Sequence, residues 1–229
     1  MTVHRFFVLP AEAVGDRFPL PGSIQHQVRR VLRMRDGEVL VLLTGDGSEA
    51  ICRLEGGECV VEARRPSVAE PAHRLTVVQA LLKGDGLETV IRQGTEVGVA
   101  AFRLVVTERC VARDLSSRRL DRLRSIAREA AEQSERGTVP SVDGPIPLAG
   151  ELRPESVLLA EREGVTRLAA LGAPASLIIG PEGGFAPGEL AAASAAGLQI
   201  AWLGPRILRA ETVAVAAAAA VLSRTGDFA

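Results

Sequence analysis

Short apolar runs, separated by glycine and proline, fill residues 1–70 of the chain. Short runs bounded by turn-forming residues are typical of β-strands. We therefore expect a small β-barrel whose strands cover residues 4–9, 39–43, 50–54 and 60–63. A helical repeat of apolar positions over residues 25–34 predicts one helix within this region, and Ser23 is placed to cap its first turn.

A different pattern begins at residue 71, where continuous apolar runs alternate with amphipathic segments. Such runs are typical of strands buried in a parallel sheet, and the segments between them of crossover helices. The strands expected are 75–82, 102–107, 157–160, 177–179 and 200–203. The helices expected are 87–97, 116–137, 162–171 and 211–224, with a short helical spacer before the last strand. The fold class predicted is α/β with a mostly parallel sheet, and prolines at 66 and 71 place the boundary between domains 1–70 and 71–229.

The longest predicted helix, residues 116–137, has Ser116 or Ser117 as its cap and ends at Gly137. Polar residues crowd its last turns: Glu129, Glu132, Gln133, Ser134 and Arg136. Carboxylates at the end of a helix oppose its dipole, so we expect partners that compensate their charge. Two interpretations follow, namely ion pairs on the helix surface or a polar wall of an active site.

The final helix is apolar on every side, because residues 213–222 include no polar side chain. A helix of this kind must be buried on every side. We expect a second copy of the protein to cover one face, with alanines allowing close approach of the two backbones. The sequence therefore predicts a homodimer, and burial wholly within one chain is the alternative.

Composition narrows the class of function. The apolar fraction of 47% is ample for a core, and the net charge of −1 argues against a nonspecific polyanion binder held by bulk charge. Cys52, Cys59 and Cys110 match no metal-binding spacing and the three histidines lie far apart, so we expect reduced thiols and no metal site. The sequence shows neither a leader segment nor a membrane-spanning run, which predicts a soluble, cytoplasmic protein.

Arginine dominates the basic residues, since Lys83 is the only lysine among 27. We attribute this bias to a genome rich in G and C and reserve phosphate recognition for specific clusters. One cluster occupies the polar face of the first predicted helix: His26, Arg29, Arg30, Arg33 and Arg35. Four guanidinium groups so close together exceed what solubility requires, so we expect this face to contact phosphate groups. A solvated face is the alternative for the arginines, and a structural role is the alternative for His26.

Two glycine-bearing loops late in the chain indicate a ligand site. The strand at 177–179 opens into Gly180-Pro181-Glu182-Gly183-Gly184, and the strand at 200–203 opens into Gly204-Pro205. Clustered glycines let a backbone turn sharply or approach a ligand closely. We expect the two loops to be neighbours at the carboxyl edge of the sheet, where open α/β sheets hold ligands. No strand exit carries GxGxxG, which disfavours a dinucleotide cofactor.

Together, GPEGGF at 180–185 and LGPRILRAET at 203–212 resemble the signature of the bacterial 16S rRNA uridine-N3 methyltransferases, a branch of the SPOUT superfamily. The similarity extends to residues 4–7, to His26 with 31–33, to 95–99 and to 130–134. It implies an N-terminal barrel of PUA or OB type, a C-terminal trefoil knot and a homodimer. It further implies methyl transfer from S-adenosyl-L-methionine to N3 of a uridine in 16S rRNA, as free rRNA or in the assembled small ribosomal subunit. The alternatives are a knotted RNA ribose 2′-O-methyltransferase and an RNA-binding module without catalysis.

The resemblance also implies which residues hold the cofactor and the RNA. The cofactor-binding residues expected are Leu159, Ile179, Gly180, Gly183, Gly184, Leu203, Gly204, Ile207, Leu208, Arg209 and Thr212. For catalysis, we expect Arg209 to orient the base or offset charge on its carbonyl oxygens, and Glu211 or Glu182 to accept the imide proton. A Glu–Arg pair that only anchors the loop is the alternative. The RNA-binding residues expected, which would serve the active site of the partner subunit, are Arg5, His26, Arg29, Arg30 and Arg33.

Overall fold

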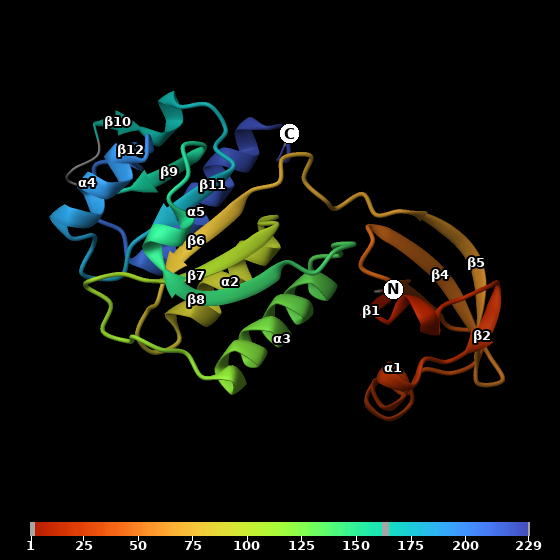
Figure 1. Ribbon diagram of the computed structural model, residues 1–229. Helices are drawn as coiled ribbons and strands as arrows, with labels where there is room; N and C mark the ends of the chain where they lie inside the picture. The colour runs from red at the N-terminus through yellow and green to blue at the C-terminus, as the bar shows by residue number, and fades with distance from the viewer. Residues whose placement is uncertain (1–2, 162–164, 229) are drawn as a thin grey trace. The chain divides into compact units, whose positions relative to one another are not determined.

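The chain divides into two compact units in the computed structural model, which describes residues 3–161 and 165–228 (Figure 1). The N-terminal unit comprises Met1–Glu70 and Ala131–Val139, and the C-terminal unit comprises Pro71–Ala130 and Pro140–Ala229. The sequence pattern predicted a single boundary near residue 70 and so assigned residues 131–139 to the second domain. In the structure these residues belong to the N-terminal unit instead.

A five-stranded sheet with the order β1-β3-β4-β5-β2 forms the N-terminal unit. Its strands are β1 (His4–Phe7), β2 (Arg17–Pro19), β3 (Val39–Leu43), β4 (Ser48–Glu55) and β5 (Glu58–Pro66). β1 pairs with β3 in parallel, and the other neighbours are antiparallel. Gly56 and Gly57 join β4 to β5 with φ angles of +58° and +90°, as a tight hairpin turn requires. The four strands expected here are confirmed, whereas β2 was not predicted because its three residues end in a proline.

The helix predicted over residues 25–34 begins and ends earlier. It starts as α1 (Gly22–His26) and continues with π-helical hydrogen bonds as η2 (Gln27–Val31). Arg33 has a φ of +54°, a left-handed conformation through which a right-handed helix does not continue. The expected cap was wrong, because Ser23 lies inside the helix and its hydroxyl donates to a carboxylate outside it at 3.0 Å.

The C-terminal end of α3 (Ser117–Gln133) belongs to the N-terminal unit. Glu132 accepts a hydrogen bond from the backbone N–H of Phe7 at 2.9 Å. The buried Arg136 donates to the Glu70 carboxylate at 2.9 Å. The polar groups at this helix end therefore hold β1 and the end of the first chain segment in place, which supports ion pairing over a polar wall of an active site.

α3 is shorter than the sequence pattern predicts. Ser116 is its cap, because the hydroxyl of Ser116 accepts the backbone N–H of Arg119 at 3.3 Å. The helix ends at Gln133 rather than at Gly137. Glu135 takes a φ of +61°, and this reversal of backbone handedness stops the helix before the glycine is reached.

A seven-stranded sheet with the order β10-β12-β9-β11-β6-β7-β8 forms the C-terminal unit, and all of its neighbours pair in parallel. Its strands are β6 (Thr76–Ala80), β7 (Ala101–Val106), β8 (Ser141–Pro147), β9 (Ser156–Leu159), β10 (Thr166–Arg167), β11 (Ser176–Ile179) and β12 (Gln199–Trp202). The remaining helices are α2 (Gly86–Glu96), α4 (Pro187–Ala195) and α5 (Ala210–Arg224). The parallel sheet is confirmed, but β11 and β12 are not neighbours, because β9 lies between them (Figure 1).

Two parts of this unit differ from the sequence pattern. Residues 162–164 of the expected helix 162–171 lie outside the described residues. The rest of that segment forms β10 and a 3-10 turn at Leu168–Ala170, because pairing with β12 overrides its helical pattern. β8 was not predicted because Gly144 and Pro145 indicate a turn, although a strand at the edge of a sheet tolerates proline.

α5 packs against α2 and over β6 and β11. Its buried face consists of Ala210, Val213, Ala214, Ala217, Ala218, Val221 and Leu222. On the rest of the helix, Val215, Ala216 and Ala219 are half-buried and Ala220 is exposed. Packing within one chain therefore does not bury this helix on every side. None of the described helices is long and apolar enough to cross a bilayer.

Candidate active site

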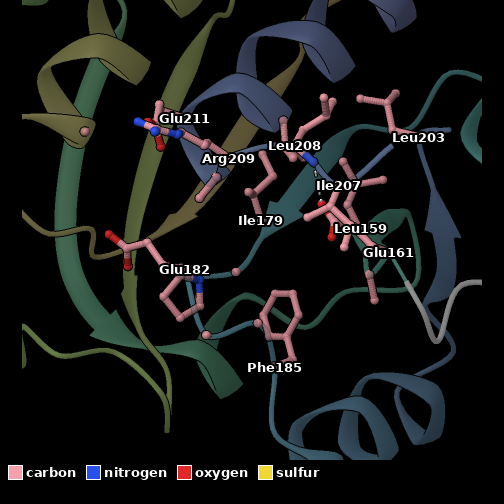
Figure 2. A pocket seen from close by; sticks show the side chains of 18 of the residues that line it. Leu159, Glu161, Ile179, Glu182, Phe185, Leu203, Ile207, Leu208, Arg209 and Glu211 are labelled. Carbon is pink, nitrogen blue, oxygen red and sulfur yellow. Dashed lines mark hydrogen bonds between the residues drawn. The ribbon is translucent and has the colours of Figure 1, made fainter. Parts of the chain in front are cut away.

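A cavity of about 1010 Å³ lies at the carboxyl edge of the parallel sheet. The loops that follow β6, β7, β9, β11 and β12 line it together with the first turn of α5 (Figure 2). The cavity is thus assembled within the C-terminal unit at the edge where parallel sheets hold ligands. It brings together twelve of the residues singled out in the sequence: Leu159, Ile179, Gly180, Glu182, Gly183, Gly184, Leu203, Gly204, Ile207, Leu208, Arg209 and Glu211.

Thr212 is the one predicted cofactor residue that the cavity does not include. Its side chain is exposed, while Glu211 and Val213 on either side of it line the cavity. The rotation of successive residues around α5 turns Thr212 outward.

The glycines of the loop after β11 are favoured by close packing and by backbone conformation. A Cβ at Gly180 would lie 3.1 Å from the ring of Phe185, and one at Gly183 would lie 3.3 Å from Cβ of Arg109. Gly184 has a φ of +67°, which side chains other than glycine rarely adopt. The backbone of this loop is thereby fixed against its neighbours at the rim of the cavity.

Hydrogen bonds join this loop to the loops after β6 and β7. A carboxylate oxygen of Glu182 accepts the backbone N–H of Lys83 at 3.0 Å. The guanidinium of Arg109 donates to the carbonyl of Gly183 at 3.0 Å. These contacts organise the loops before any ligand arrives, which reduces the entropy that binding must overcome.

A further carboxylate organises the other side of the cavity. Glu161 follows β9, and one of its oxygens accepts the backbone N–H of Leu208 at 3.1 Å. The loop after β12 is therefore tied to the loop after β9. Sequence reasoning did not include Glu161, although its place directly after a predicted strand could have indicated it.

Most of the labelled apolar side chains lie at one end of the cavity together with Glu161, and the other labelled charged side chains lie at the opposite end (Figure 2). Leu203, Ile207 and Leu208 gather at one end, near Leu159. The apolar floor is buried, with Ile179 and Phe185 exposing 2% and 6% of their surface. The shape and chemistry of this end suit a flat, mostly apolar ring.

Arg209, Glu211 and Glu182 lie at the opposite end (Figure 2). In the part of the chain that the structure describes, Arg209 forms no ion pair with either glutamate, and Glu182 instead holds a backbone N–H. The alternative of a Glu–Arg pair that anchors the loop is therefore not what the structure contains. The guanidinium of Arg209 is available to a ligand.

Several cavity residues were missed by sequence reasoning: Lys83, Asp85, Arg109, Glu161, Phe185, Trp202 and Arg206. Most of them follow a strand that the sequence predicts, so the rule that strand exits line the site would have selected them. What the sequence could not indicate is which exits lie next to one another.

The formal charges of the cavity lining balance. The basic residues are Lys83, Arg109, Arg206 and Arg209, and the acidic residues are Asp85, Glu161, Glu182 and Glu211.

Trp202, the single tryptophan of the chain, ends β12 and lines the cavity. Its register partner on β10 is Arg167, whose guanidinium carbon lies 4.9 Å from the centroid of the indole ring. This cation–π contact holds the indole in a fixed position beside the cavity.

The arginine cluster of the N-terminal unit is only partly available to a ligand. His26, Arg30 and Arg33 are exposed, and none forms an ion pair within the described ranges. Arg29 is engaged instead, since it pairs with Asp36 at 3.0 Å. Arg35 is exposed as well, and its side chain has no ion-pair partner among the described residues, so four of the five members of the surface that sequence reasoning assigned to phosphate groups are free.

Arg5 is not on that surface. Its guanidinium pairs with Glu49 and, at 2.9 Å, with Glu135, and only 12% of its side chain is exposed. Glu49 is held from its other oxygen by Arg65. This geometry corrects the expectation of a phosphate contact, because the charge of Arg5 is already compensated inside the unit.

The cysteines of the N-terminal unit are buried free thiols. Burial raises the pKa of the Cys52 thiol to about 12 and that of the Cys59 thiol to about 11. Both groups are therefore protonated at neutral pH and are poor nucleophiles. Among the described residues, no three histidine, cysteine or carboxylate side chains gather in a way that could hold a metal ion.

Comparison with known families gives two matches. Residues 69–222 match the RNA methyltransferase domain, and residues 20–62 match the RNA methyltransferase PUA domain. The ribosomal RNA small subunit methyltransferase E of Mycobacterium tuberculosis is 40% identical over 241 residues, which cover 96% of this chain and 92% of that protein. The protein of the same name from Synechocystis is 34% identical, over 95% of this chain and 77% of its own length.

Solved structures agree with these matches. The ribosomal RNA small subunit methyltransferase E from Neisseria gonorrhoeae, bound to S-adenosylmethionine, superimposes with a TM-score of 0.87 at 31% identity, covering 97% of this chain and 98% of that one. A Legionella pneumophila protein in complex with the same cofactor gives a TM-score of 0.84 at 27% identity, covering 98% of both chains.

Proposed function

Because the chain belongs to the family of ribosomal RNA small subunit methyltransferase E, we propose that it methylates N3 of a uridine in the 16S rRNA of the small ribosomal subunit. The observation that carries this proposal is the cavity at the carboxyl edge of the sheet, with an apolar end and a charged end. Methyl transfer to a base needs both, one for the methyl donor and one for the base.

The fold is that of the family. A small N-terminal PUA domain precedes an α/β domain with a parallel sheet, and the solved relatives of SPOUT type cover nearly the whole chain. An enzyme that modifies rRNA works where ribosomes are assembled, which supports a cytoplasmic location.

The residues of the cavity fit S-adenosylmethionine. Leu203, Ile207 and Leu208 offer apolar surface for adenine, beside the buried Ile179. The first N–H groups of α5 have no partner within the helix and can donate to a ligand at its start. When bound, the cofactor supplies a methyl carbon attached to a positively charged sulfur.

The charged end supports a reaction at N3. The imide proton must leave before N3 can accept a methyl group, and the anion that forms must be stabilised. We assign Arg209 to orient the base and offset charge on its carbonyl oxygens. Glu182 is engaged with the backbone of Lys83, so we assign proton acceptance to Glu211, which is half-buried and lines the same end. N3 lies on the pairing edge, so the target base must be unpaired.

The test is a transfer assay with small ribosomal subunits, or free 16S rRNA, that lack the modification. Labelled cofactor is incubated with the enzyme, and the nucleosides are separated by mass spectrometry. We expect label in 3-methyluridine. Label in a 2′-O-methylated ribose would replace the proposed reaction with the knotted 2′-O alternative, and absence of both label and cofactor binding would indicate an RNA-binding module.

We further propose that His26, Arg30 and Arg33 contact RNA phosphates. All three are exposed: His26 and Arg30 lie in the helical segment formed by α1 and η2, and Arg33 follows its end at Val31. In the variant Arg30→Gln/Arg33→Gln, binding to 16S rRNA should weaken, and the slope of log affinity against log salt should fall by roughly 1 to 2, as two phosphate contacts predict. The measurement is a filter-binding titration over a range of salt concentrations. Arg17→Gln, which removes an arginine already paired with Glu55 and Glu58, is the control, and an unchanged slope in the double variant would contradict the assignment.

We also propose that the enzyme is a homodimer. α5 leaves the side that carries Val215, Ala216 and Ala219 half-buried, and these side chains are apolar and small enough for a second helix to approach closely. We expect sedimentation equilibrium at micromolar concentration to give twice the monomer mass of 24.1 kDa. Ala219→Glu should shift the protein toward monomer, because it places a charge in that contact. A wild-type protein that sediments as a monomer would contradict the proposal.

A further inference from the structure

Lys83 follows β6 and lines the charged end of the cavity through the loop that leads into α2. Its backbone N–H is held by Glu182 at 3.0 Å. Its ammonium group is exposed and has no hydrogen-bond or ion-pair partner among the described residues. The protein therefore fixes the backbone of this residue and leaves its charge free at the rim.

Lysine at this position is informative because the chain uses it nowhere else. The chain has 27 lysine and arginine residues, and all of them except Lys83 are arginine. If a positive charge of any kind were enough, arginine would serve here as it does throughout the chain. An ammonium group is a compact charge that approaches a single oxygen, whereas a guanidinium spreads its charge over a planar fork. The single lysine of the chain at this position therefore favours one acceptor atom over a bidentate group.

We infer that the ammonium of Lys83 stabilises the negative charge that appears on a uracil carbonyl oxygen when N3 loses its proton. The inference rests on the proposed reaction at N3 and goes beyond it by assigning this residue. As the proton passes to a carboxylate, its electron pair is shared by N3 and the two carbonyl oxygens. N3 then forms a bond to the methyl carbon, and the sulfur keeps the pair of the broken carbon–sulfur bond.

The position of the other cations supports this assignment. Arg109 is committed to the carbonyl of Gly183. Arg206 and Arg209 belong to the loop after β12, whereas Lys83 belongs to the loop after β6. Arg209 and Lys83 therefore reach the cavity from two different loops, and each can face one of the two carbonyl oxygens that flank N3.

The test compares Lys83→Gln, Lys83→Arg and the wild type on small ribosomal subunits that lack the methyl group. We expect Lys83→Gln to lower kcat by about 100-fold, as the loss of one donor to a developing oxyanion does elsewhere. KM for the subunit and the calorimetric affinity for S-adenosylhomocysteine should stay unchanged. Lys83→Arg should retain more activity than Lys83→Gln. Arg92→Gln removes one charge from an exposed position of the adjoining helix and should leave kcat unchanged.

The pH profile separates this role from a structural one. A nearby cation lowers the pKa of the bound imide. The ratio of the wild-type kcat to the Lys83→Gln kcat should therefore be constant at low pH. It should shrink once the pH passes the imide pKa in the wild-type complex, because the uracil is then already ionised in the wild type. A deficit independent of pH would overturn the inference. So would a higher KM with unchanged kcat, which would place the ammonium on an RNA phosphate, or a loss of cofactor affinity.

The proposed function and this inference fail in distinguishable ways. If the wild type produces no 3-methyluridine, the reaction itself is wrong. If the wild type produces it and Lys83→Gln does so at the same rate, the reaction stands and the assignment of Lys83 is wrong.

Discussion

Arg209→Ala should lower the rate of methyl transfer by about 100- to 1000-fold, the effect of removing one preorganised group that stabilises charge in a transition state. Arg209 lines the charged end of the cavity and forms no ion pair within the described residues. Its charge is therefore free to act on the base. The measurement is a single-turnover transfer of label from the cofactor to undermodified small subunits.

The fold should survive this substitution. Arg209 is the residue that precedes α5, but its side chain makes no capping hydrogen bond, so alanine removes no support from the helix. Arg118→Ala, at an exposed position of α3 outside the cavity, is the matched control and should keep the full rate. An Arg209→Ala enzyme as fast as the wild type would remove this residue from the mechanism.

Glu49→Ala should lower the free energy of unfolding of the N-terminal unit by about 3 kcal/mol, because it leaves the mostly buried guanidinium of Arg5 with only the exposed Glu135 as its partner. Glu49 exposes 4% of its side chain and pairs with Arg5, which exposes 12%. The measurement is urea unfolding followed by circular dichroism. Glu62→Ala removes a much more exposed ion pair with Arg53 in the same unit and should cost less than about 1 kcal/mol.

This ion pair also makes stability depend on pH in a defined direction. Burial alone would raise the pKa of Glu49, but hydrogen bonds from Arg65 and Arg5 outweigh it and hold the pKa below the usual value of 4.5. The stabilisation is therefore complete above the unfolded pKa and is lost as the pH falls through the folded one. Glu49→Ala should flatten this acid dependence, and an equally steep profile in the variant would contradict the role of the pair.

Local patterns were enough for the elements that carry the site. The strand-to-loop transitions after Ile179 and Trp202 and the start of α5 were predicted within about one residue, because apolar runs followed by glycine and proline leave few other conformations. The same local rules failed for β8, where Gly144 and Pro145 indicate a turn. In that segment pairing with β7 decides the conformation.

Tertiary relationships account for the rest. Arg5 was assigned to RNA because sequence shows its charge but not the carboxylate of Glu49, which lies more than forty positions away and compensates it. Lys83 was not among the candidate site residues, because sequence does not show that its loop lies beside the loop after β11; the bond from its backbone to Glu182 and its place in the cavity lining show this.

The place of Trp202 has a practical consequence for every binding experiment suggested above. The chain has no tyrosine and a single tryptophan, so its near-ultraviolet emission comes from one indole at the wall of the cavity. Occupancy of the site should be readable as a change in intrinsic fluorescence, without a label and in real time. The molecule thus carries a built-in optical probe of its own ligand.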